Sequence, residues 1–121
     1  MSDLAAIGTD QLVRRFVEIT VKQGQASDVF DARTYNRLYT QMMDVVNELR
    51  RRPGDQRRAL MVLYEHPNAQ VRMMAAHMTL AIAYQTARDV LQTIMDRKEF
   101  PQALSAGMSL TDLDRGTYKP T

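Results

Sequence analysis

The chain has 121 residues, with 16 Lys and Arg against 14 Asp and Glu, two histidines and no cysteine. This length is typical of one domain with a sizeable hydrophobic core. Without cysteine the chain forms no disulfide, thiol nucleophile or thiolate metal site, and its two distant histidines make no zinc pattern. A content of 45% hydrophobic and 25% charged residues is that of an ordinary globular domain.

The sequence gives no sign of export or of membrane insertion. The first seven residues carry neither a basic cluster nor a long apolar run. The most apolar stretch, residues 71–84, is interrupted by Arg72 and His77 and is too short to cross a bilayer. We therefore expect a soluble, cytoplasmic protein with no membrane partner.

Helical spacing of apolar residues begins near the N-terminus. The first predicted helix runs from Asp10 to Gln23 and ends at Gly24, a residue that favours the left-handed turn after a helix. The second ends at Arg52, before Pro53-Gly54-Asp55, and Glu48 precedes Arg52 by the four residues of a helical ion pair. Its apolar stripe consists of Tyr35, Leu38, Tyr39, Met42, Val46 and Leu49.

The same spacing continues to the C-terminal end. A third helix, 56–65, ends at His66-Pro67, and Asn68 is placed to cap a fourth, 69–84, which is apolar on several sides and therefore expected to be central. The stretch 86–89 resembles a capping box that opens a fifth helix, and a sixth ends at Arg115 before Gly116. No segment alternates as a half-buried strand would. The sequence thus predicts an all-α fold of about six antiparallel helices.

One central pattern resembles a HEAT-type helical repeat. It consists of Leu60, Leu63 and Tyr64 on a first helix, a turn with Pro67 and Asn68, and then Val71, Arg72, Ala75, Ala76 and Leu80 on a second. The resemblance implies a HEAT/armadillo-like, right-handed α-α superhelical stack. It also implies a structural role for Arg72, which in such repeats binds loop carbonyls or an acidic residue between helix pairs. The small alanines suit closely stacked helices.

The resemblance also implies the domain organisation. We expect a single domain over residues 1–116, with a capping helix pair at 10–52, a HEAT-like pair at 55–84 and a C-terminal pair at 86–116, followed by a loose tail at 117–121. The chain length and the ending from Asp112 to Tyr118 are similar to those of a bacterial family of small proteins, about 120 residues long, of unknown function.

Five arginines flank the Pro-Gly turn: Arg50, Arg51, Arg52, Arg57 and Arg58. Their guanidinium groups are candidates for binding phosphates or a partner's carboxylates in bidentate fashion. The alternative is that those at the helix C-terminus are solvated and favoured by the helix dipole, an explanation that suits Arg57 and Arg58 less well. No aromatic residue lies among the five, so we do not expect tight nucleic-acid binding.

No motif indicates catalysis, a cofactor or a metal. His77 is expected to be a hydrogen-bonded residue at the edge of the core, since no motif pairs it with a nucleophile. Asp112 and Asp114 diverge on a helix, and the five glycines form no phosphate loop. Nine methionines are mostly core filler, although we expect one of Met42 and Met43 and one of Met73 and Met74 to face a second layer, an oligomer interface or solvent.

The function expected from the sequence is therefore non-catalytic. The first hypothesis is a protein-interaction or adaptor module that uses the surface of a small helical stack, with another protein as its partner. A nucleic-acid-associated protein that binds phosphates through the arginine cluster is the alternative, and a small enzyme around His77 is a second alternative that no motif supports. A homodimer through the methionine-bearing helices is compatible with each.

Overall fold

The computed structural model describes residues 3–121, so Met1 and Ser2 of the expected N-terminal start lie outside it. The described residues form helices and turns, with no strand among them, which confirms the all-α prediction. Five are α-helices and two are 3₁₀ helices: η1 (Leu4–Ala6), α1 (Thr9–Asp28), α2 (Ala32–Arg51), η2 (Gln56–Glu65), α3 (Ala69–Thr79), α4 (Tyr84–Asp96) and α5 (Gln102–Arg115).

Contacts within the chain divide it into two compact units, the first ending at Leu60 and the second running from Met61 to Thr121. The 3₁₀ helix η2 continues along the chain from one unit into the next. The single domain and the right-handed superhelical stack that we expected from the sequence stay predictions.

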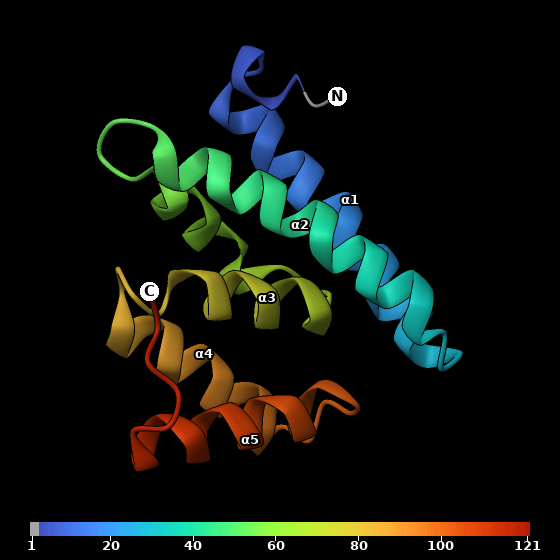
Figure 1. Ribbon diagram of the computed structural model, residues 1–121. Coiled ribbons are helices and arrows are strands. Elements are labelled where there is room, and N and C mark those ends of the chain that lie inside the picture. The colour runs from blue at the N-terminus through green and yellow to red at the C-terminus, as the bar shows by residue number, and fades with distance from the viewer. Residues whose placement is uncertain (1–2) are drawn as a thin grey trace. The chain divides into compact units, whose positions relative to one another are not determined.

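The first unit is a helical hairpin. The helices α1 and α2 lie side by side and are joined by a three-residue turn, so they run antiparallel (Figure 1). Asp31 begins α2 by accepting a hydrogen bond from the backbone N of Thr34, 3.1 Å away. Hydrogen bonding from the side chain and then the backbone of Thr34 holds the pKa of the Asp31 carboxyl below the ordinary value. The buried residues of the hairpin include Leu12, Phe16, Ile19, Leu38, Met42, Val45, Val46 and Leu49.

Two expectations for this unit are wrong. The helix α1 does not end at Gly24 but continues to Asp28, because packing and backbone hydrogen bonding outweigh the roughly 1 kcal/mol that a glycine costs inside a helix. On α2, Tyr39 belongs to the predicted apolar stripe but is 40% exposed, whereas Val45, which the stripe left out, is buried.

Arg52 fastens the N-terminal segment to the end of α2. Its guanidinium donates to the carbonyl oxygens of Leu4 at 3.0 Å and Ile7 at 2.7 Å, and to the hydroxyl of Thr9 at 3.3 Å. It also binds Glu48 at 3.0 Å, which confirms the predicted helical pair. One side chain thereby ties two carbonyl groups and a hydroxyl of the N-terminal segment to the end of α2.

The second unit contains α3, α4 and α5, and α4 packs against both of the others (Figure 1). Asn68 caps α3 through the backbone N atoms of Gln70 and Val71, as predicted. Residues 70–76 are all buried, as expected for a helix that is apolar on several sides, so Met73 and Met74 both lie inside. Of the three expectations for one member of this pair, a second layer, an oligomer interface or solvent, burial excludes solvent.

The boundary between the fourth and fifth predicted helices is also wrong. The helix α3 ends at Thr79, and α4 begins at Tyr84 without a side-chain cap, so 86–89 is not a capping box. Asp89 instead accepts a hydrogen bond from the side chain of Gln85, 2.9 Å away. The turn at 80–83 has no Gly or Pro to mark it. At the other end, Gly116 closes α5 with a φ of 75°, as predicted.

The first testable prediction concerns Arg52. Arg52→Met should lower the free energy of unfolding by about 1–3 kcal/mol, because two carbonyl groups, a hydroxyl and a carboxylate lose a donor. Amide hydrogen exchange should become faster between Leu4 and Thr9. Urea unfolding and exchange measured by mass spectrometry give the two readouts.

Arg51→Met is the matched control. Arg51 also binds Glu48, at 2.9 Å, but its side chain is 70% exposed, and exposed pairs contribute about 0.5 kcal/mol or less. Equal effects of the two substitutions would contradict the role given to Arg52.

Candidate functional site

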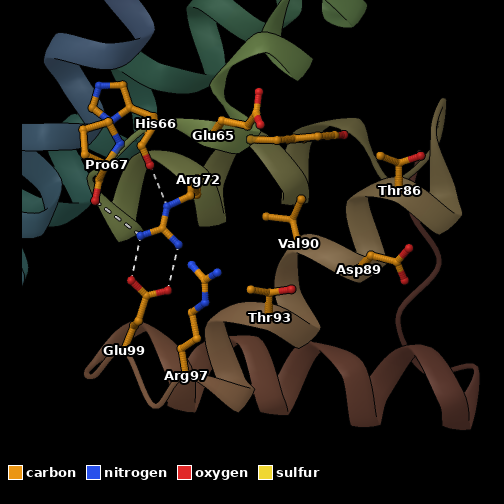
Figure 2. Close-up of a pocket in the computed structure, with 11 residues that line it drawn as sticks. Glu65, His66, Pro67, Arg72, Thr86, Asp89, Val90, Thr93, Arg97 and Glu99 are labelled. Carbon is orange, nitrogen blue, oxygen red and sulfur yellow. Dashed lines mark hydrogen bonds and ion pairs between the residues drawn. The ribbon is translucent and has the colours of Figure 1, made fainter.

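A groove with a volume of about 700 Å³ opens on the second unit (Figure 2). One wall is the end of η2 and the following turn, which contribute Tyr64, Glu65, His66 and Pro67. The other wall is a face of α4, with Thr86, Asp89, Val90, Thr93 and Arg97. Arg72 of α3 and Glu99 of the loop between α4 and α5 close one end.

That end is built around the guanidinium of Arg72. Its Nη1 and Nη2 atoms donate to the two carboxylate oxygens of Glu99, each at 2.7 Å. Its Nε donates to the carbonyl of His66 at 2.7 Å, and Nη2 also donates to that of Pro67 at 3.3 Å (Figure 2). Hydrogen bonds from Arg72 hold the pKa of Glu99 below its ordinary value. Arg72 therefore contacts loop carbonyls and an acid, as the repeat resemblance implies.

Arg97 adds a second guanidinium at the same end. It is exposed, points toward the Arg72–Glu99 pair, and makes no side-chain hydrogen bond or ion pair with residues 3–121 (Figure 2). Asp89 lies on the same face of α4, eight residues earlier and so two helical turns away, about 12 Å along the axis. The groove thus has a positive group at one end and a negative group farther along.

The hydroxyl of Tyr64, a residue that lines the groove, already has a partner within the protein. The hydroxyl of Tyr64 contacts the hydroxyl of Thr79, which itself donates to the carbonyl of Ala75 at 2.8 Å. Burial raises the pKa of Tyr64. These groups are engaged with one another, so the exposed charged side chains, Glu65, Asp89 and Arg97, are the parts of the groove that are open to a ligand.

The five-arginine cluster is only partly a surface feature. Arg52 is committed to the N-terminal segment, and Arg57 is buried against Asp55, with two contacts of 2.8 and 2.7 Å. Its hydrogen bonds hold the pKa of Asp55 below the ordinary value. Arg50, Arg51 and Arg58 are exposed, and within the described chain only Arg51 of these three has a side-chain ion pair.

His77 lies on α3, where its Nε2 atom is 2.9 Å from the hydroxyl of Ser109 on α5. The sequence did not indicate this pair, because the two residues are 32 positions apart. Burial lowers the pKa of His77 from 6.5 to about 4. A base of such low pKa holds a proton poorly at neutral pH, and His77 does not line the groove, so the contact serves packing between α3 and α5.

The described residues contain no group of three His, Cys, Asp or Glu side chains arranged to hold a metal ion. Among the same residues, no helix has the length and apolar character that a membrane span requires.

Comparison with known proteins places the chain in a family. Residues 10–114 match a domain of unknown function, DUF2019. The chain belongs to this family. It is similar to the protein RPA1889 from Rhodopseudomonas palustris CGA009, whose crystal structure has a TM-score of 0.95 with 45% sequence identity over 100% of both chains. No curated protein matches the chain.

These matches support a small, all-helical bacterial type of protein, as the ending of the sequence suggested. The HEAT-like repeat stays a prediction. The sequence did not reveal the groove, although Asp89, Thr93 and Arg97 show the four-residue spacing of one helical face.

The second testable prediction concerns Arg72. Arg72→Met should lower the free energy of unfolding of the protein by about 2–4 kcal/mol, because it leaves Glu99 and two carbonyl groups without their donor. Chemical denaturation at pH 7 measures it. Asp114→Asn is the control, since it removes an ion pair whose carboxylate side is 64% exposed and should cost about 0.5 kcal/mol or less. A loss at Arg72 as small as the control's would contradict the role proposed for the pair.

The third prediction concerns pH. The folded-state pKa of His77, about 4, lies below its ordinary value of 6.5, so the unfolded chain takes up the proton first. The titration of His77 therefore leaves the free energy of unfolding unchanged above about pH 6.5 and lowers it as the pH falls from 6.5 toward 4. Between pH 7.5 and pH 5, His77 should account for a loss of about 2 kcal/mol. Urea unfolding at both values should show a smaller loss for His77→Gln, and an unchanged difference would exclude this assignment.

Proposed function

We propose that the chain is a non-catalytic protein-binding module that holds an extended segment of another protein in the groove between η2 and α4. The observation that carries this proposal is that two opposite charges, Asp89 and Arg97, lie along one open wall of the groove. A lined groove with a few fixed polar groups is the usual form of a recognition site.

The spacing of the two charges suggests the form of the partner. An extended chain advances about 3.3 Å per residue, so about four residues cover the roughly 12 Å between Asp89 and Arg97. A segment with a basic side chain near Asp89 and an acidic side chain near Arg97 would match both. Val90 and Thr93 offer one apolar and one hydroxyl contact between them.

The rigid hydrogen bonding at the Arg72–Glu99 end of the groove supports a role for Arg97 in binding a partner rather than only in contact with water. Arg72 and Glu99 are held to each other and to the turn by four hydrogen bonds, so the surface beneath Arg97 is fixed before a partner arrives. Pre-organised sites lose less conformational entropy on binding. The guanidinium of Arg97 can then receive a carboxylate through two parallel hydrogen bonds.

The charge of the groove favours a peptide over a nucleic acid. Glu65, Asp89 and Glu99 line it beside Arg72 and Arg97, so a polyanion would meet three carboxylates. The arginine cluster offers only Arg50, Arg51 and Arg58 at the surface of the first unit. A segment of mixed charge, in contrast, is complementary to the groove.

The fourth prediction tests this function by a reversal of specificity. Peptides selected from a display library against the wild-type chain should contain a basic and an acidic residue about four positions apart. Arg97→Glu should weaken the best of them about tenfold or more, because a carboxylate then faces a carboxylate. Isothermal titration calorimetry measures the change.

The control is Arg115→Glu, an equal change of charge at an exposed position outside the groove. It should leave the affinity within about twofold, since exposed charges at a distance are screened. Replacing the acidic residue of the peptide by arginine should restore binding to Arg97→Glu. Selected peptides whose affinity is indifferent to Arg97 and to Asp89→Lys would exclude the groove as the binding site.

A further inference from the structure

The outer face of α5 carries exposed apolar side chains that no part of the second unit covers. Leu104 and Met108, four residues apart on α5, are 64% and 68% exposed, and Phe100, in the loop just before α5, is 61% exposed. Met95 of α4, 36% exposed, lies beside them. We call these four residues the α5 surface. Soluble proteins rarely leave such a row in water unless it is an interaction site.

The α5 surface has a hollow as well as projecting side chains. The hollow, about 500 Å³, is lined by Met95, Phe100, Leu104, Gly107 and Met108, and by Ala103 beneath them. Gly107 lets the side chain of Met95 lie close against α5, because the sulfur of Met95 is only 3.2 Å from the place where a Cβ of residue 107 would be. A face with both a hollow and adjacent projections can fit a copy of itself across a two-fold axis.

The charges at the two ends suggest how two copies would align. Lys98 is exposed just before α5, and Asp112, also exposed, lines the hollow toward the end of α5. Neither side chain has a hydrogen bond or ion pair with the rest of the described chain. An antiparallel copy brings each Lys98 toward the other chain's Asp112, whereas a parallel copy places like charges together.

We propose that the α5 surface binds a second copy of this chain, with the two α5 helices antiparallel and Leu104 and Met108 of each filling the hollow of the other. The proposal does not depend on the groove. On α4, Met95 and Arg97 are two residues apart and so point to different sides of the helix. A dimer of this form leaves both grooves open.

The fifth prediction concerns assembly. In sedimentation velocity over a range of protein concentrations, the wild-type chain should shift from monomer to dimer as the concentration rises. Leu104→Glu should raise the dimer Kd about tenfold or more, because it places two carboxylates in an apolar contact. Val62→Glu is the matched control, since Val62 is 72% exposed but lies on η2, and it should leave the Kd within about twofold.

A charge exchange tests the antiparallel alignment and does not rely on Leu104→Glu remaining folded. Lys98→Glu and Asp112→Lys should each raise the dimer Kd about threefold to tenfold, and the double variant should return it to the wild-type value. Sedimentation at low and high salt should show that the single effects shrink as charges are screened. A chain that stays monomeric at all concentrations, a Leu104→Glu dimer as stable as that of Val62→Glu, or a double variant without recovery would overturn the proposal.

Discussion

The bidentate contact between Arg72 and Glu99 determines much of the second unit. Arg72 is only 9% exposed, and a charge so placed is tolerated only when it is paired. Glu99 neutralises its charge, and the carbonyls of His66 and Pro67 accept two further hydrogen bonds from it. The loop after α4 is thereby tied to the turn before α3, and these two segments form one end of the groove. The position of Arg97, only two residues before Glu99, follows from the same contact.

Arg52 links two segments in the first unit in the same way, because it binds the carbonyls of Leu4 and Ile7 together with the carboxylate of Glu48. A planar guanidinium has five donors in a fixed fork, so one side chain can serve two carbonyls and a carboxylate at once, which a lysine does less well. Arg57 is committed in a similar way to Asp55. A cluster of arginines in the sequence is therefore not equivalent to a positive surface, because the folded chain uses some of the charges internally.

The sequence predicts the helices well because their apolar spacing is local information. It predicts their ends less well: Gly24 lies inside α1, and the turn at 80–83 has no residue that breaks a helix. It also cannot predict the groove, since Glu65 and Asp89 are brought to one site only by the packing of α3 and α4. Nor does local spacing indicate that Arg97 lies beside the Arg72–Glu99 pair, because Arg72 and Glu99 are 27 positions apart in the chain.

The helix α4 contributes side chains to the core, to the groove and to the α5 surface. Ala87, Leu91 and Ile94 are fully buried, while Asp89, Thr93 and Arg97 line the groove and Met95 belongs to the α5 surface. A groove that holds about four residues of a partner makes a small contact, and small contacts give weak binding. Two grooves on one dimer would act on a partner with two such segments as a single bivalent site, with an affinity well above that of either groove. Self-association through α5 would then give a small adaptor a binding strength that one short groove does not supply.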